Sequence, residues 1–397
     1  MKTIILIMAP MYQGGSPSGG DNFFINLCVG DRSEIHVCFS GTEDCSYIGQ
    51  SVVTHTPPKS LRGLIGFSRI SDLLVLSVLA VGSVLRLRSI LKSQQAIVTT
   101  CYVASDFFPD VVGGLCAKLL FQCRLVNCIF LMAPRLRTVK IRYVFRTVCY
   151  QLSQCLTHSI IRKSSDMLFF CSNVTKEMFF QRTENKLPHI LIHGGVEEPL
   201  NGRCNRSVSL QNFEYGPCAY ASVYFARLHP QKGVLNAVKI WLYVSQVVPD
   251  ARFAIIGEGP ELAASHELAK ALGIYEKIDW LGYVSREQLP NLVKRVKTMV
   301  HPVDYDTGGM APIELTKYGV PMFCFEHPGM REMYGDLANY SPYPDVKILA
   351  RKIIEVISDR ARLSEMSKKS FELSKPFYWS RLRPYFIDEL AKYDIIL

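Results

Sequence analysis

The sequence lacks the features that mark several common protein classes. None of its 13 cysteines belongs to a Cys-x-x-Cys pair, which argues against a zinc site or a dithiol motif. Most cysteines lie in apolar runs such as Leu120 to Cys128, so we expect small buried side chains in a reducing compartment. There is no apparent internal repeat, and 48% hydrophobic with 20% charged residues exclude a disordered chain.

Long apolar segments are also scarce. The uncharged run from Leu73 to Leu85 has 13 residues, whereas a helix needs about 20 residues to span a bilayer. We therefore expect a buried core helix or a helix lying at a membrane surface, because arginines flank the run. At the N-terminus only about seven apolar residues separate Lys2 from Pro10, which favours a first buried strand over a signal peptide. The expected location is cytoplasmic.

Acidic residues are few in the first half of the chain. Residues 1–195 hold 20 Lys and Arg against 11 Asp and Glu, a net charge of +9, while residues 196–397 hold 25 against 24. The stretch from Val111 to Ser165 contains nine basic residues and no acidic one. A field of this sign attracts an anionic membrane surface, a polyphosphate lipid or nucleic acid.

The pattern around these basic residues separates the three partners. At helical spacing Arg135, Arg142 and Arg146 fall on one stripe, which favours an anionic membrane surface contacted through residues 118–163, with the protein peripheral on the cytoplasmic face. A solvated helix face is the alternative. Nucleic acid is not expected, because the stretch is aliphatic and lacks aromatic stacking platforms.

Strands and helices alternate along both halves. In the first half the expected strands are Thr3–Ala9, Ile35–Phe39, Ser51–His55, Ala96–Tyr102, Leu125–Met132, Met167–Cys171 and Ile190–His193, with residues 104–114 as a strand-end loop. In the second half they are Ala219–Ala226, Arg252–Gly257, Ile278–Leu281 and Thr298–His301, alternating with helices Val234–Val247, Leu262–Leu272 and Arg286–Val293. The alternation predicts an α/β chain of two Rossmann-like domains with parallel sheets, residues 1–196 and 218–375, joined by a polar linker at 197–217.

One stretch of the second half, Met299 to Met322, concentrates ligand-binding features. A strand end leads into a loop with Asp304 and Asp306, then Gly308-Gly309, then a helical run that carries Glu314. Paired glycines let the backbone approach a ligand, and the first amides of the following helix suit a phosphate. A carboxylate one turn into that helix can accept hydrogen bonds from sugar hydroxyls. Together these features indicate a nucleotide-sugar site.

The same half resembles the retaining glycosyltransferases of family 4 (GT4), also called glycosyl transferases group 1. Residues 225–233, F-A-R-L-H-P-Q-K-G, resemble the family's R-L-x-x-x-K-G signature, and Asp306 to Glu314 resembles its E-G-F-G-x-x-x-x-E segment. Residues 255–262 and 280–289 are similar to its G-x-G-x-x and L-G-x-v-x-x-x-x-L elements. In the first half, Gly19-Gly20 is expected to end the loop Met11 to Asp21 and resembles the glycine pair that opens the family's acceptor domain.

This resemblance implies a GT-B fold, in which two Rossmann-like domains face a central cleft and a final helix, here 376–397, packs back on the first domain. It assigns the nucleotide-sugar donor to the second domain and the acceptor to the first. Arg227 and Lys232 would stabilise the departing diphosphate, and Asp306 would lie near the transferred sugar, so these three are the catalytic candidates. The donor-binding candidates are Glu314, on the ribose, and Gly308, Gly309, Met310, Ala311, Gly257, Val284, Gly19 and Gly20.

The resemblance also implies a reaction. The chain would be a retaining hexosyltransferase that moves a hexose from a UDP- or GDP-type donor to an acceptor hydroxyl. The positive charge of the first half favours a lipid-linked or membrane-surface glycan, such as a polyprenyl-phosphate glycan, as the acceptor. The nucleotide-sugar is a substrate, so no cofactor and no metal are expected. Two alternatives stay open: a nucleotide-sugar epimerase of the same fold, and a catalytically weakened GT-B partner subunit.

The chain departs from the family's pattern at two places. Asp306 stands where a glutamate is usual and is one methylene shorter. In addition, the strand ends at Cys101-Tyr102-Val103 and Phe130-Leu131-Met132 carry no histidine, whereas many members have one near the reacting sugar. Front-face attack, which the family is thought to use, needs no obligatory protein nucleophile. These departures motivate the partner-subunit alternative.

Overall fold

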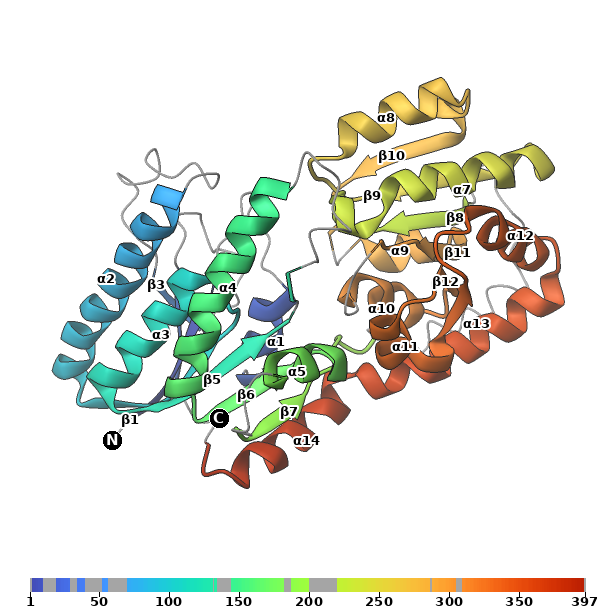
Figure 1. Ribbon diagram of the computed structural model, residues 1–397. Coiled ribbons are helices and arrows are strands. Elements are labelled where there is room, and N and C mark those ends of the chain that lie inside the picture. Colours follow the sequence, from blue (N-terminus) through green and yellow to red (C-terminus); the bar gives the residue numbers. More distant parts are fainter. Residues whose placement is uncertain are drawn as a thin grey trace. The chain divides into compact units, whose positions relative to one another are not determined.

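A computed structural model describes residues 2–9, 19–28, 34–39, 52–55, 70–130, 132–133, 144–181, 187–199, 220–285, 288–304 and 309–395. The chain forms two compact units, drawn in Figure 1. Unit 1 comprises Met1–Gly194 and Arg383–Leu397, and unit 2 comprises Gly195–Leu382. The end of the chain therefore belongs to the same unit as its beginning.

Unit 1 is built on a seven-stranded parallel sheet with the strand order β3-β2-β1-β4-β5-β6-β7. The strands are β1 (Lys2–Ala9), β2 (Glu34–Phe39), β3 (Val52–His55), β4 (Ala96–Val103), β5 (Arg124–Ile129), β6 (Met167–Phe170) and β7 (His189–Leu191). Most of their central residues are apolar, and β6 is a fully buried apolar run, Met167–Phe170. Such runs suit a parallel sheet that helices cover on both faces.

Helices cover the two faces of this sheet unequally. They are α1 (Gly19–Cys28), α2 (Ile70–Gln94), α3 (Phe108–Phe121), α4 (Val144–Ser164), α5 (Asn173–Phe180) and α14 (Trp379–Ala391). One core joins strand residues such as Leu6 to residues of α2, α3 and α4, including Val84, Val111 and Ile161, and these three helices lie side by side in Figure 1. A separate aromatic group joins α1 to α14, where the rings of Phe23 and Phe386 meet edge to face at 5.4 Å.

Three expectations for unit 1 need correction. The segment 104–114 is not all loop, because α3 begins at Phe108 and contains Gly113 and Gly114. A Cβ on Gly113 would lie 2.4 Å from the Met8 side chain, and one on Gly114 would lie 2.4 Å from Val103, so the pair lets α3 pack closely on the sheet. Likewise Gly19 and Gly20 do not end a loop: they are the first residues of α1.

The third correction concerns α2. Its 25 residues continue through Arg86, Arg88 and Lys92, well past the uncharged run, because these side chains are good helix formers. The segment Leu74–Gln94 is long and apolar enough to cross a membrane by length and composition alone, and 39% of its apolar stretch is buried inside the protein. The length argument against a spanning helix was therefore wrong.

Unit 2 repeats the architecture with a six-stranded parallel sheet in the order β10-β9-β8-β11-β12-β13. Its strands are β8 (Tyr220–Phe225), β9 (Arg252–Ile256), β10 (Ile278–Gly282), β11 (Val296–His301), β12 (Met322–Phe325) and β13 (Ala338–Ser341). Its α-helices are α7 (Val234–Val247), α8 (Leu262–Ala271), α9 (Leu289–Val293), α10 (Met310–Thr316), α11 (Pro328–Tyr334), α12 (Val346–Ile357) and α13 (Arg360–Ser374). The expectation of parallel sheets in both halves is confirmed.

Both sheets reverse their strand order once, between β1 and β4 and between β8 and β11. Ligands of open α/β sheets bind at such switch points, beyond the carboxyl ends of the strands. In unit 2 the loops after β8 and β11 therefore flank the expected site, and in unit 1 the loops after β1 and β4 do so.

The cysteines are free thiols in the part of the chain that the structure describes, and seven of the ten described are buried. Burial raises the pKa of the Cys38 thiol to about 12 and that of Cys123 to about 11. These side chains therefore behave as small hydrophobes rather than as nucleophiles.

Candidate active site

The loop after β8 holds the two cationic candidates of unit 2. Arg227 is exposed and Lys232 is half-buried. The hydroxyl of Tyr224 lies 3.2 Å from the backbone carbonyl oxygens of both Arg227 and Lys232, so it holds the two ends of this loop together. A tight turn, Pro230–Lys232, then leads to Gly233 at a φ of +72°, where any other residue is strained.

The loops after β8 and β11 are packed against each other. A Cβ on Gly233 would lie 1.8 Å from the carbonyl oxygen of Pro302, so only glycine fits at this approach. The Asp304 amide donates to the Gln231 carbonyl at 3.0 Å, and the Asn236 amide donates to the Asp304 carboxylate at 2.8 Å. Asp304 thus fixes one loop to the other. The next residues, 305–308, lie outside the described chain, and with them the candidates Asp306 and Gly308.

The start of α10 follows this gap. Gly309 precedes the helix, and its amide donates to the Tyr334 hydroxyl at 2.7 Å, while that hydroxyl donates to the Gly309 carbonyl at 2.6 Å. Gly309 is a donor-binding candidate, so its amide was expected to face the nucleotide-sugar, whereas here that amide donates to the Tyr334 hydroxyl. Met310 and Ala311 are the first two residues of α10 and are half-buried.

Glu314 is buried on α10 and paired with a cation. Its carboxylate lies 2.6 Å from Lys317 Nζ, with side-chain exposures of 9% for Glu314 and 7% for Lys317. The same ammonium group donates to the Glu197 carbonyl at 3.0 Å. Lys317 was missed from the sequence, although a Glu and a Lys three positions apart on a helix face each other. The carboxylate expected to bind ribose is therefore already held in place.

Gly257 and Val284 belong to the same edge of the sheet. Gly257 follows β9, and its amide donates to the Gly282 carbonyl at 2.7 Å. A Cβ there would lie 2.0 Å from the Ala226 carbonyl oxygen, so the loop after β9 lies directly against the loop that carries Arg227. Val284 packs, half-buried, against the core on one face of the sheet. The structure thus brings the loops after β8, β9 and β11 together, as the motifs predict. Gly19 and Gly20 belong to unit 1, at the start of α1.

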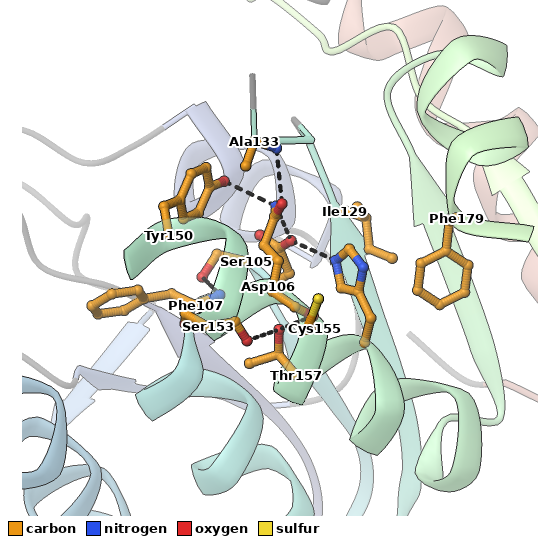
Figure 2. Close-up of polar contacts among 12 residues, drawn as sticks. Ser105, Asp106, Phe107, Ile129, Ala133, Tyr150, Ser153, Cys155, Thr157 and Phe179 are labelled. Atoms are coloured by element: carbon orange, nitrogen blue, oxygen red, sulfur yellow. Dashed lines mark hydrogen bonds and ion pairs between the residues drawn. The ribbon is translucent and has the colours of Figure 1, made fainter. Parts of the chain in front are cut away.

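Unit 1 carries a buried polar cluster beside its own switch point, shown in Figure 2. Asp106 follows β4, and one of its carboxylate oxygens lies 2.9 Å from His158 Nε2 and accepts a 2.7 Å hydrogen bond from the Gln154 amide. The side-chain oxygen of Gln154 accepts a hydrogen bond from the Ala133 backbone amide at 2.8 Å. The side-chain amide group of Gln154 also donates to the Tyr150 hydroxyl at 3.1 Å. Residues of α4 thus hold the segments that follow β4 and β5.

This cluster supplies a His–Asp pair that the sequence did not reveal. Neither β4 nor β5 ends in a histidine, but His158 reaches the end of β4 from α4, 52 positions after Asp106. Both side chains are buried, and the Asp106 carboxylate finds its polar partners in the Gln154 amide and the His158 ring. Such a network positions loops at the edge of the sheet. Only the three-dimensional fold brings the two residues together.

The basic stretch of unit 1 is partly satisfied by the protein itself. Lys118 Nζ lies 2.8 Å from the Asp166 carboxylate, which follows the acid-free stretch directly. Arg162 donates to the Phe179 carbonyl at 2.7 Å and stacks over the Phe179 ring. Arg135 and Arg142 lie outside the described residues, as does the side chain of Arg146. Within the described chain there is no group of three or more side chains suited to a metal ion.

The comparisons agree on the architecture and on the second unit. Residues 219–372 match the model of the family "Glycosyl transferases group 1". The chain is 26% identical over 166 residues to the uncharacterized glycosyltransferase YqgM of Bacillus subtilis, covering 42% of this chain and 43% of that protein. It is 28% identical over 102 residues to O-antigen chain mannosyltransferase B of Escherichia coli, covering 26% and 27%. These matches span less than half the length of either relative.

A solved structure extends the likeness to the whole chain. The Anabaena protein Alr3699/HepE, crystallised in complex with UDP-glucose, superposes with a TM-score of 0.72 at 15% sequence identity, covering 98% of this chain and 99% of its own. The GT-B fold expected from the sequence, two Rossmann-like domains with parallel sheets, is thereby confirmed. The signature R-L-x-x-x-K-G lies within the family match and at the carboxyl end of β8.

Proposed function

We propose that this chain is a glycosyltransferase that takes a nucleotide-sugar as donor and transfers its hexose, with retention, to an acceptor hydroxyl. The proposal is carried by one observation: the segment that matches the group 1 family puts Arg227 and Lys232 on the loop beside the switch point of its sheet. Nucleotides and other ligands bind at such points in parallel α/β sheets.

The chemistry asks for positive charge in this position. When the bond between the sugar's C1 and the diphosphate oxygen breaks, negative charge develops on the leaving diphosphate. A fixed cation lowers that barrier, because it interacts more strongly with the developing charge than with the bound donor. Arg227 would contact two phosphate oxygens through its planar fork, and Lys232 would act as a point charge. The acceptor hydroxyl would attack from the face that the diphosphate leaves.

We propose a UDP-hexose as the first donor to test. The Anabaena protein was crystallised with UDP-glucose, and another structural neighbour, the pneumococcal O-GlcNAc transferase GtfA, with UDP and GlcNAc at a TM-score of 0.58. The E. coli relative is a mannosyltransferase by name, so GDP-mannose is the second donor to test. Glu314 would bind the ribose, and Lys317 would keep its carboxylate fixed.

For the acceptor we propose a lipid-linked glycan bound at the carboxyl edge of the sheet in unit 1, where the cluster around Asp106 holds two loops. The positive charge of this half supports an acceptor that carries phosphate, such as a polyprenyl-phosphate glycan. A catalytically weakened partner subunit is the second candidate, because the Glu314 side chain is only 9% exposed and leaves little surface for a ribose.

The test is sugar transfer by the purified full chain. UDP- and GDP-linked hexoses are supplied singly with a polyprenyl-phosphate glycan fraction, and the released nucleoside diphosphate is measured. We expect one donor to give acceptor-dependent release. Replacing Lys232 with alanine should slow it by about 10²–10³-fold, the usual cost of losing one transition-state charge contact, while Lys239→Ala, an exposed lysine on α7, should leave the rate unchanged.

Two outcomes would decide against the enzyme. If no donor yields diphosphate while the chain stays folded, the partner-subunit reading replaces it. If Lys232→Ala transfers sugar as fast as the unaltered chain, the site is elsewhere. The anomeric configuration of the product, determined by proton NMR, tests retention separately.

A further inference from the structure

Helix α2 leaves a line of aliphatic side chains in solvent. Leu74, Val78 and Leu85 are 62%, 71% and 48% exposed. Their spacings of four and seven residues put them on one line of the helix, opposite the buried line that includes Ala80 and Leu87. The helix is therefore apolar on both sides in its first half, although among the described residues only one side is packed against the rest of unit 1.

Helix α4 repeats this arrangement. Phe145, Leu152 and Leu156 are 76%, 61% and 60% exposed, and spacings of seven and four residues again define one line. Between the two helices lies α3, which contacts both and exposes Leu119; the three helices form one layer in Figure 1. The outward side of this layer, with these seven side chains, is called the outer helix face below. Exposed large apolar side chains gathered on one layer of helices indicate an interaction site.

The charge of the outer helix face has one sign. Each aliphatic line ends in an exposed lysine placed 18 residues after its first member, Lys92 on α2 and Lys163 on α4, and 18 residues are five helical turns. The sequences of the three helices contain two acidic residues, Asp72 and Asp110. Asp110 is fully buried, and the Asp72 side chain is outside the description. Among the described side chains of these helices, no carboxylate is exposed.

This combination fits a lipid surface better than a protein partner. Protein interfaces are anchored by Trp, Tyr and Arg in shaped pockets, whereas the outer helix face offers Leu, Val and one Phe on neighbouring convex helices. Aliphatic and Phe side chains flanked by lysines are typical of helices that lie at the boundary between headgroups and acyl chains of an anionic bilayer.

The packing of α2 also determines whether the helix crosses a bilayer or lies along its surface. The helix is long enough to cross one, but Leu76, Ala80, Val84, Leu87 and Leu91 are buried in the core of unit 1. A crossing would remove these side chains from the sheet and empty the core. A helix held in this way can only lie flat on the surface.

We propose that the outer helix face docks unit 1 on an anionic phospholipid bilayer, with the seven apolar side chains in the headgroup boundary and Lys92 and Lys163 against lipid phosphates. The proposal does not rest on the transfer reaction. It narrows the membrane contact expected from residues 118–163, because Lys118 and Arg162 are held by internal contacts. The surface keeps the exposed positions of α3 and α4 from that stretch and adds those of α2.

Vesicle cosedimentation of the full chain tests the proposal. The vesicles contain phosphatidylcholine alone or equal parts of phosphatidylcholine and phosphatidylglycerol. We expect binding to the anionic vesicles only. A variant with Leu74, Val78, Leu152 and Leu156 replaced by serine should bind at least about tenfold more weakly, since each lost insertion removes apolar burial. Because all four positions are exposed, its unfolding temperature should match that of the unaltered chain.

Two further variants complete the experiment. Lys92→Gln with Lys163→Gln should weaken binding to anionic vesicles by roughly tenfold, as expected for two basic residues near a charged membrane surface. Val247→Ser, at an equally exposed aliphatic position on unit 2 (64%), should change nothing. Arg227→Ala should still bind vesicles, so failure of the transfer reaction and failure of docking can be told apart.

The proposal is overturned if the unaltered chain ignores anionic vesicles, or if the four-serine variant binds them as well as the unaltered chain. It is equally overturned if light scattering finds a dimer that the four-serine variant abolishes without any lipid dependence. In that case the outer helix face is a contact between two copies of the chain.

Discussion

The buried ion pair between Glu314 and Lys317 permits a quantitative prediction. Lys317→Met keeps the length and apolar stem of the side chain but leaves the Glu314 carboxylate buried, with its charge uncompensated. Both side chains are less than 10% exposed, so the pair is in the class where removing one partner costs about 3–5 kcal/mol. In a unit of this size each kcal/mol lowers Tm by about 2–4 °C. We therefore expect unit 2 to unfold roughly 10 °C earlier, as measured by differential scanning calorimetry of the full chain.

Two controls separate charge burial from lost packing. Adding Glu314→Leu to Lys317→Met removes both charges and should recover most of the stability, because a buried pair replaced by apolar groups is near neutral. Lys375→Met breaks an exposed ion pair with Glu372 and should cost less than about 1 kcal/mol. The reasoning is refuted if Lys317→Met is no more destabilising than Lys375→Met, or if the double variant is less stable than the single one.

Two further predictions concern a loop and a titrating pair. Gly233→Ala would place a methyl carbon 1.8 Å from the Pro302 carbonyl oxygen and should lower the Tm of unit 2 strongly. The control is Gly273→Ala, where φ is +67° but nothing lies within 4 Å, so the cost should be about 1–2 kcal/mol and the loss of Tm smaller. Equal Tm values for the two variants would contradict this. Burial, followed by the charge of His36, lowers the pKa of His55 in the folded state to about 4, whereas His55 in the unfolded chain has the ordinary pKa of 6.5. Between these values the unfolded state binds the proton, so the stability that His55 contributes is complete above pH 6.5 and declines as pH falls toward 4. Urea unfolding checks this, because His55→Gln should show a flatter dependence of stability on pH.

Local patterns were sufficient for the parts of the fold that depend on one segment at a time. The expected strands correspond to β1 to β11, because each is a short apolar run between turn residues, whereas β12 (Met322–Phe325) and β13 (Ala338–Ser341) were missed. The same reasoning failed where tertiary packing decided the outcome. Gly113 and Gly114 were read as a loop, but they lie in α3. They are glycines because the sheet leaves no room for side chains at these two positions.

Contacts between distant residues were beyond the reach of the sequence. Asp106 and His158 are 52 positions apart and come from different elements, so nothing in either segment predicts their pairing. The outer helix face is a similar case: an apolar residue on α2 or α4 looks the same in the sequence whether it faces the sheet or solvent. Lys317 differs, because its spacing from Glu314 on one helix was visible and only its burial was not.

The central claim is that unit 2 binds the diphosphate of a nucleotide through the loop after β8, and equilibrium calorimetry tests it most directly. UDP and GDP are titrated into the full chain, into Arg227→Ala, and into Arg351→Ala, an exposed arginine on α12. We predict saturable binding of one nucleotide, weakened about tenfold or more by Arg227→Ala, since a hydrogen bond to a charged group contributes about 1.5–3 kcal/mol, and unchanged by Arg351→Ala. Absence of binding by the folded chain, or equal affinity in Arg227→Ala, would contradict the claim.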